Sequence, residues 1–142
     1  MPAARFERIA RGNFESFVAL VRAQYAELKS PFGVAQRRAL RMLVRGDAFG
    51  HGWLIKFNAV PAGFVIVSLG YSVEYGGRDA FIDELYVRPE FRRRGLGSRA
   101  VRFAERFCRG RCVATMHLEV ARNNRTAKGI YSRAGFRATD SC

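Results

Sequence analysis

The residues best suited to chemistry lie in a short basic loop, Arg92-Arg93-Arg94-Gly95-Leu96-Gly97-Ser98. Apolar residues recur at helical spacing directly after this loop, so its glycines stand at the start of a predicted helix. Glycines there let successive backbone N–H groups point in one direction, and the positive end of the helix macrodipole favours an anion. The loop therefore predicts a phosphate cradle surrounded by arginines. A tight turn beneath a solvated run of arginines is the alternative.

Two segments must position this loop. Before it, an apolar run from Phe81 to Val87 predicts a strand, which Pro89 ends because proline cannot donate a further ladder bond. After it, apolar residues at one-face spacing from Ser98 onward predict an amphipathic helix. The loop thus connects a strand to a helix.

The loop resembles the (Arg/Gln)-x-x-Gly-x-(Gly/Ala) acetyl-CoA signature of the GNAT N-acetyltransferase superfamily. A second segment, Asn124-x-x-Ala127-x-x-x-Tyr131-x-x-x-Gly135-Phe136, resembles the downstream motif of that family, in the same order and spacing. The resemblance covers nearly the whole chain. It implies one domain over residues 1–142 with an α/β (α+β) GNAT fold, in which a central, mixed, twisted sheet carries helices on both faces.

The resemblance also implies where acetyl-CoA binds. In the family, the strand that matches Phe81 to Val87 splays away from its neighbour, and pantetheine pairs with it like an added strand, with backbone contacts at Leu85 and Val87. The amides from Arg93 to Ser98 would hold the pyrophosphate, and Arg92 would add a charge-assisted bond. The full set of implied cofactor-binding residues is Leu85, Tyr86, Val87, Arg92, Arg93, Arg94, Gly95, Leu96, Gly97, Ser98, Asn124 and Ala127.

The implied reaction is direct transfer of acetyl to an amine, which is nucleophilic only when neutral, so a carboxylate helps to remove its proton. Asp83 and Glu119 are equally favoured as this base. Glu84 is expected on the opposite strand face from Asp83, as a salt-bridge or substrate-binding residue. For each of them, an ordinary strand-end carboxylate paired with an arginine is the alternative.

Tyr131 resembles the general acid of the family, which protonates the departing thiolate. Outside the motif, a tyrosine on a short amphipathic helix is usually a core residue with a bonded hydroxyl. His51 and His117 lack a metal-ligand pattern, and each is expected to be structural. We therefore expect acetyl-CoA as the co-substrate and no metal.

Composition limits the number of domains and the compartment of the protein. A chain of 142 residues with 49% hydrophobic content fits one domain with one core. The N-terminus lacks a continuous apolar h-region, and no apolar run approaches the ~20 residues of a membrane span. Three cysteines without metal-ligand spacing favour a reducing compartment, so we expect a cytoplasmic protein and no membrane contact.

The charge is unusual, with 25 basic residues against 12 acidic ones and a formal net charge of +13. Such a surplus suits RNA, an anionic surface or a polyphosphate cofactor. A genome rich in G and C would also enrich arginine without a functional cause. Spread of the arginines along the chain argues against a dedicated nucleic-acid arm.

Patterning predicts the order of the remaining elements, with turns at glycine, proline and asparagine. The expected elements are a strand at Arg5–Ile9, helices at Phe14–Leu28 and Ala35–Val44, strands at Trp53–Phe57 and Gly63–Leu69, a strand at Cys112–Val120 and a helix from Asn123 or Asn124 to Gly135. The second strand of the hairpin is expected to extend past Gly70 toward Glu74.

The C-terminus departs from the family, because Phe136 to Cys142 leaves room for one short strand where two are usual. Either the final strand is absent, or a partner supplies it, or the sequence is cut short. An uncovered sheet edge would favour a homodimer, since unpaired edges promote aggregation.

These features predict an N-acetyltransferase, an acyltransferase that moves acetyl from acetyl-CoA to a primary amine of a small amine, a polyamine or a protein N-terminus. The central carboxylates favour a cationic acceptor, whereas the net charge favours an acidic or nucleic-acid-linked one. One alternative is a GNAT-type toxin that acetylates aminoacyl-tRNA. A second is a non-catalytic module that binds acyl-CoA or nucleic acid.

Overall fold

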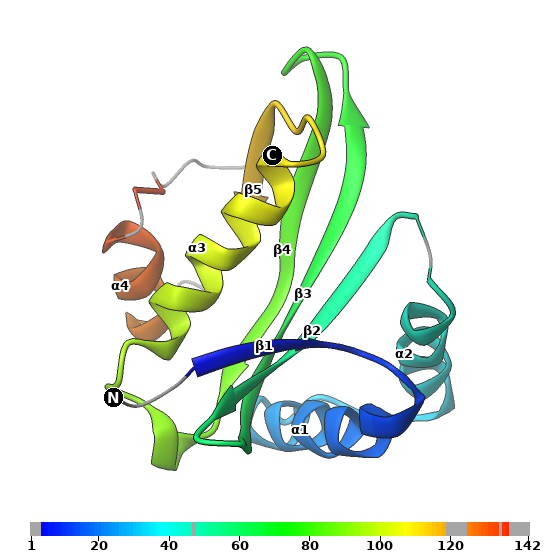
Figure 1. Ribbon diagram of the computed structural model, residues 1–142, viewed down its shortest axis with the longest axis vertical. Coiled ribbons are helices and arrows are strands. Elements are labelled where there is room, and N and C mark those ends of the chain that lie inside the picture. The colour runs from blue at the N-terminus through cyan, green and yellow to red at the C-terminus, as the bar shows by residue number, and fades with distance from the viewer. Residues whose placement is uncertain (1–3, 47, 119–124, 134, 137–142) are drawn as a thin grey trace.

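The computed structural model describes residues 4–46, 48–118, 125–133 and 135–136, with the side chains of 125–127 excepted. Its described strands form one sheet in the order β1-β2-β3-β4-β5 (Figure 1). Their bounds are β1 Ala4–Arg8, β2 Gly50–Phe57, β3 Val60–Ser72, β4 Gly77–Val87 and β5 Thr115–Leu118. The β1–β2, β2–β3 and β3–β4 pairs are antiparallel, while β4 and β5 are parallel. The sheet is therefore mixed, as predicted.

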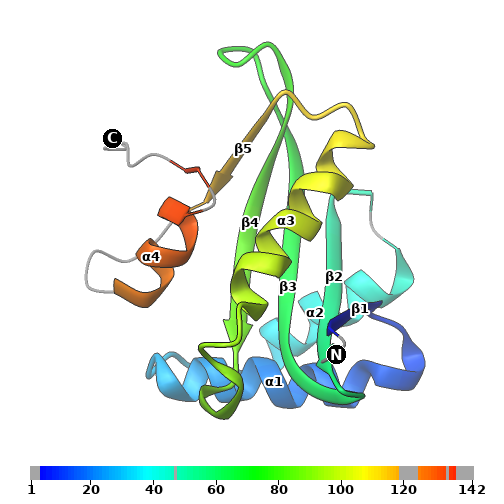
Figure 2. The ribbon, with the colours of Figure 1, turned by 60° about the vertical axis from the view of Figure 1, so that its left-hand side comes forward.

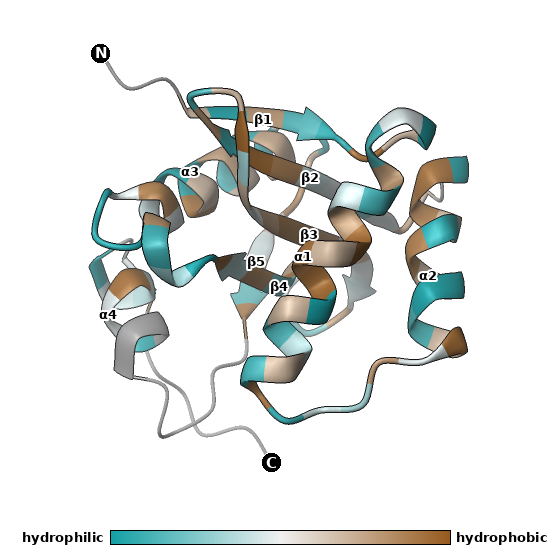
Figure 3. Ribbon diagram, turned by 90° about the horizontal axis from the view of Figure 1, so that it is seen from below, coloured by the Kyte–Doolittle hydropathy of each residue, from teal (hydrophilic) through white to brown (hydrophobic). Residues whose placement is uncertain are grey.

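Helices cover both faces of this sheet. Their bounds are α1 Phe14–Glu27, α2 Val34–Arg45, α3 Leu96–Arg109 and α4 Arg125–Arg133, with 3-10 turns η1 at Arg11–Asn13 and η2 at Pro89–Phe91. Helices α1 and α2 lie on one face, while α3 lies on the other with α4 beside it (Figures 2 and 3). None of the helices in the described ranges is long and apolar enough to cross a membrane.

Alternation along β3 divides the core into two clusters. Phe64 and Ile66 pack with α1, whereas Val65 and Val67 pack with α3. Side chains alternate across a strand, so a run of apolar residues supplies both faces of a sheet that is covered on both sides. The brown strands between the helices in Figure 3 show this continuous apolar layer. Each face of the sheet therefore has its own core cluster.

The hairpin between β2 and β3 is tighter than the predicted one. Asn58 and Ala59 both have positive φ, at 50° and 68°, and form a two-residue connection. Such a connection matches the twist of the flanking strands, so Val60 and Pro61 belong to β3 and not to a loop. Strand β3 runs on to Ser72, and the predicted extension past Gly70 is confirmed.

Two other boundaries differ from the predictions. Strand β2 begins at Gly50, earlier than Trp53, because His51 and Gly52 are already buried and paired with β3. Strand β5 begins at Thr115, later than Cys112, since Cys112 has a φ of 58° and lies in a turn. The predicted strand end at Val120, and residues 137–142 beyond the last helix, lie outside the described residues.

Candidate active site

A cleft of about 480 Å³ lies where four elements meet, namely α1, β4, the start of α3 and α4. Most of the predicted cofactor loop and Tyr131 line this cleft, although they are far apart in the sequence. Its lining residues are Gln24, Glu27, Leu28, Leu85, Tyr86, Val87, Phe91, Arg92, Arg93, Gly95, Leu96, Gly97, Ser98, Ile130, Tyr131 and Arg133. The cleft is open enough to admit a ligand from solvent and has both apolar and basic walls.

The loop before α3 has the conformation that an anion cradle needs. Arg93 and Gly95 are both left-handed, with φ of 65° and 76°, and α3 begins at Leu96. The N–H of Arg99 donates to the carbonyl of Gly95, so the amides of the first turn before it have no carbonyl partner within the helix. Those amides and the helix macrodipole favour a phosphate at this end of the cleft.

Gly97 serves the packing of α4 as well as the cradle. A Cβ at this position would lie 2.8 Å from Cδ1 of Ile130, the neighbour of Tyr131. A side chain at this position would therefore displace the tip of Ile130, the residue before Tyr131. The glycine thus lets α4 approach closely enough to bring Tyr131 to the cleft.

The edge of strand β4 that lies in the cleft has no strand partner among the described residues. Its pairing with β5 covers Asp79 to Ile82 in the described residues, and the next residues toward Val87 line the cleft. The N–H of Arg88 donates to Ala62 of β3, and backbone groups alternate in direction along a strand. The polar backbone groups of Leu85 and Val87 therefore face away from β3, toward the edge where the pantetheine arm was predicted to pair.

A bulge in β4 changes the expected placement of the carboxylates. Ile66 pairs with Glu84 and the adjacent Val67 pairs with Ile82, so Asp83 is the extra residue. Ile82 and Leu85 both pack on the α3 face, although a regular strand would put residues three apart on opposite faces. The prediction that Asp83 and Glu84 lie on opposite faces was therefore wrong, because the bulge interrupts the alternation.

Glu84 is the half-buried one of these two carboxylates. The hydroxyl of Tyr25 donates to its Oε2 at 3.4 Å. Burial raises the pKa of Glu84, the charge of Asp83 adds to the rise, and the hydrogen bond from Tyr25 opposes it. Asp83 is exposed. Glu84 therefore binds a proton more readily than an ordinary exposed carboxylate does.

Tyr131 is buried at the wall of the cleft, with 8% of its surface exposed. Its ring packs against the edge of Phe136, at a centroid distance of 6.1 Å. Burial raises the pKa of Tyr131 to about 12, so its hydroxyl keeps its proton at neutral pH. The phenol can therefore donate a hydrogen bond or a proton to a ligand in the cleft.

Arg92 lies in the cleft but is already engaged. Its Nε donates to the carbonyl of Val87 at 2.8 Å, and its Nη2 donates to the two carboxylate oxygens of Glu27 at 2.9 and 3.1 Å. Its guanidinium lies 5.7 Å from the centre of the Tyr86 ring. This arginine closes a contact between α1 and the cofactor loop.

The other predicted site residues fall into three groups. Arg93 lines the cleft, whereas Arg94 lies over the ring of Phe57 at 5.4 Å and does not line it. Glu119 and Asn124 lie outside the described residues, as does the side chain of Ala127. The assignments of these last three residues stay predictions.

His117 belongs to a cluster on the α1 face of the sheet. Its Nε2 lies 3.5 Å from Oδ2 of Asp79, and its ring packs against Tyr75 and Phe81. Asp79 is 9% exposed. In the described part of the chain, no group of three or more His, Cys, Asp or Glu residues could hold a metal ion.

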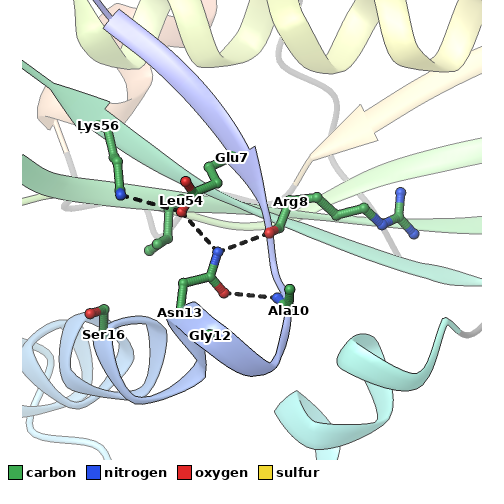
Figure 4. A pocket seen from close by; sticks show the side chains of 8 residues that line it. All are labelled: Glu7, Arg8, Ala10, Gly12, Asn13, Ser16, Leu54 and Lys56. Carbon is green, nitrogen blue, oxygen red and sulfur yellow. Dashed lines mark hydrogen bonds and ion pairs between the residues drawn. The ribbon is translucent and has the colours of Figure 1, made fainter. Parts of the chain in front are cut away.

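A second pocket of about 460 Å³ lies between β1, η1 and the start of α1 (Figure 4). Its polar groups bond to one another, since Asn13 donates to Glu7 and to the carbonyl of Arg8, and Lys56 pairs with Glu7. The Arg8 side chain turns away from this pocket toward His51. These bonds fix the entry to α1 and leave the first cleft as the candidate active site.

Sequence patterns missed the α1 side of the cleft. Gln24, Glu27 and Leu28 line it, and Tyr25 reaches Glu84. Polar residues at positions 24 and 27, three apart and so on one face of a helix, were the available signal. That signal is weak, because exposed helices commonly carry such pairs.

The fold is that of an acyltransferase family, as the comparisons show. The acetyltransferase (GNAT) family model matches residues 14–136, and the chain belongs to this family. It is an acetyl-CoA-dependent acetyltransferase.

Individual relatives are more distant. The chain is 23% identical to thialysine N-epsilon-acetyltransferase of Bos taurus, over 87% of this chain and 78% of the relative. It is 30% identical to an uncharacterized N-acetyltransferase of Methanocaldococcus jannaschii over 68% of its length, and spans 42% of that protein.

Solved structures share the fold. An integron cassette protein from a salt-marsh mobile metagenome superposes with a TM-score of 0.84 at 30% identity, over 96% of this chain and 86% of that one. An aminoglycoside N-acetyltransferase in complex with CoA gives a TM-score of 0.86 at 14% identity, covering 100% and 93% of the two chains. The predicted family and fold are confirmed.

Proposed function

We propose that the protein transfers acetyl from acetyl-CoA to a primary amine of a small, cationic acceptor. The observation that carries this proposal is the state of the carboxylates on β4. In the described residues, Asp83 and Glu84 have no ion pair with Lys or Arg, and Asp79 pairs only with His117. In a chain with 25 basic residues against 12 acidic ones, carboxylates without basic partners favour a cation supplied by the substrate.

We propose the following residue roles. The amides of Leu96, Gly97 and Ser98 hold phosphate, and the free edge of Leu85 and Val87 pairs with the pantetheine arm. The acceptor nitrogen attacks the thioester carbonyl carbon as its proton passes to a carboxylate. The C–S bond then breaks, and Tyr131 gives its proton to the departing sulfur.

Among the carboxylates, the raised pKa of Glu84 supports it as the proton acceptor. Asp83, exposed beside it, is then the residue that meets the substrate cation. This assignment reverses the two roles expected from the sequence. Glu119 stays an alternative base.

The cluster of Asp79, His117, Tyr75 and Phe81 supports a second cationic group on the acceptor. Asp79 lies five positions before Glu84 on the same strand, which corresponds to roughly 13–16 Å. Aromatic rings and a carboxylate together suit an ammonium group. The acceptor would then be an extended diamine or polyamine. The bovine relative and the CoA-bound neighbour are named for thialysine and aminoglycosides, which are also amines.

An amine panel with release of free CoA thiol as the readout tests this function. The panel holds monoamines, diamines of increasing length, an aminoglycoside, an N-terminal peptide and charged tRNA. We expect thiol release with long diamines or the aminoglycoside at far lower concentration than with monoamines of equal length. Release only with the peptide or with charged tRNA would contradict the cationic small-molecule acceptor. Binding of acetyl-CoA without release across the panel would indicate a non-catalytic module.

A further inference from the structure

The side chain of Arg92 contacts two parts of the proposed cofactor site, the backbone of β4 and a carboxylate of the cleft. Its Nε holds the carbonyl of Val87, which faces the open edge of β4. Its Nη2 holds Glu27, a carboxylate that lines the same cleft as the phosphate cradle. The Arg92 guanidinium therefore occupies a backbone acceptor that we propose for pantetheine, and the Glu27 carboxylate neutralises its charge.

Glu27 also ties the cleft to the acceptor side. It ends α1, two positions after Tyr25, whose hydroxyl donates to Glu84. The last turn of α1 thus contacts the cofactor loop through Glu27 and the candidate base through Tyr25. Movement of this turn would therefore affect both the cofactor loop and the candidate base.

We propose that Glu27 is a positioning residue that holds Arg92 across the open edge of β4 in the free protein. On cofactor binding, Arg92 leaves Val87 and Glu27 for the phosphates, and the last turn of α1 is released. This inference rests on acetyl-CoA binding in the cleft described above. Exposure makes the exchange feasible, because the side chains of Arg92 and Glu27 are 36% and 44% exposed and exposed ion pairs are weak.

Competition of this kind lowers the apparent affinity for the cofactor. When only a fraction of the protein has Arg92 free, the apparent dissociation constant equals the intrinsic one divided by that fraction. Removing the charge of Glu27 should raise this fraction and leave one more uncompensated positive charge at the cradle. Both effects tighten binding.

Calorimetry with CoA as the probe tests the competition in the full chain. Glu27→Gln should bind CoA about 3–10-fold more tightly than wild type, the size expected for one unit charge in a solvent-exposed cleft. Glu90→Gln is the matched control, since Glu90 is exposed, lies two positions before Arg92 and makes no ion pair among the described residues. It removes the same charge without touching Arg92 and should gain less than about 2-fold.

Amide hydrogen exchange in residues 24–28 provides a second readout that needs no acceptor. Addition of CoA should speed exchange there in wild type, whereas in Glu27→Gln exchange should be fast already and unchanged by CoA. Equal or weaker CoA binding by Glu27→Gln, a gain no larger than that of Glu90→Gln, or the same CoA response in both proteins would overturn the inference. Failure of wild type to bind CoA would instead overturn the proposed function.

Discussion

At the scale of single residues, Tyr131 offers the cleanest test of catalysis. Tyr131→Phe keeps the ring that packs against Phe136 and deletes only the hydroxyl. General acid catalysis typically contributes ~10²–10⁴-fold, so turnover should fall by about that range. Acetyl-CoA affinity should stay close to wild type, measured by calorimetry beside steady-state kinetics. Full turnover with chemistry shown to be rate-limiting would make the hydroxyl structural.

Glu84 gives a prediction about pH. A base must be deprotonated, so activity should rise with pH through the pKa of Glu84, which burial lifts above its ordinary range. Glu84→Gln should lower kcat/KM by about 10²–10⁴-fold and remove the acidic limb of the pH profile.

Asp83→Asn is the matched control for that variant, one residue away in the same bulge. It should raise KM for the acceptor and leave the acidic limb in place. If instead Asp83→Asn removes the limb and Glu84→Gln keeps it, the base is Asp83.

Some of the residues in the cleft could be predicted from the sequence and others could not. Tyr131 was predicted because its motif places it at a fixed spacing within one helix. Glu27 was not, since its contact with Arg92 joins residues 65 positions apart and depends on how α1 crosses the sheet. A pairwise contact between distant segments leaves no spacing pattern in a single sequence.

At the scale of elements, a charged substitution in the first turn of α3 should change helix stability and anion binding in opposite directions. Ser98 is half-buried in the cleft and lies in that first turn. Ser98→Asp places a carboxylate near the positive end of the macrodipole, which should stabilise the fold by about 0.3–1 kcal/mol. The same carboxylate should repel phosphate and weaken CoA binding by at least ~10-fold. Thermal unfolding and calorimetry measure the two effects.

Ser98→Asn is the control, because asparagine matches aspartate in shape and lacks the charge. It should lose much less affinity and gain less stability. Comparable affinity losses in the two variants would mean that bulk, and not charge, blocks the site. Gly97 is a poorer probe, since any side chain there also meets Ile130.

The elements themselves were largely predictable, and their irregularities were not. Apolar runs with period two and helical spacing gave the sheet, α3 and the cradle, because these patterns are local. The bulge at Asp83 depends on how β3 and β4 pair, so alternation along β4 alone placed Asp83 and Glu84 on opposite faces. The start of β5 was displaced by a left-handed Cys112, which composition does not indicate.

At the scale of the whole molecule, the net charge of +13 should act on stability. Like charges repel more strongly in the compact state than in the expanded chain, and salt screens this repulsion. Raising NaCl from about 20 to about 300 mM shortens the Debye length roughly from 20 to 6 Å. We expect the melting temperature to rise by about 2–6 °C in scanning calorimetry without cofactor.

Sucrose at matched osmolality separates screening from solute exclusion, because it carries no charge. A melting temperature that falls with NaCl would show that attractive ion pairs outweigh the surplus. CoA affinity should change in the opposite direction and weaken as salt rises, since its phosphates meet a basic cleft.

The bulged strand β4 has a consequence for inheritance. The backbone groups of Leu85 and Val87 face the edge proposed for the cofactor, where side-chain identity matters little, whereas Asp79 and Asp83 are proposed to meet the acceptor through their side chains. With these proposed roles, codons 79 and 83 would vary after gene duplication without touching the proposed base Glu84 or the backbone groups proposed to bind acetyl-CoA. A lineage built on this strand would then acquire new acceptors by single substitutions at these two positions, while each daughter gene keeps the same acetyl donor.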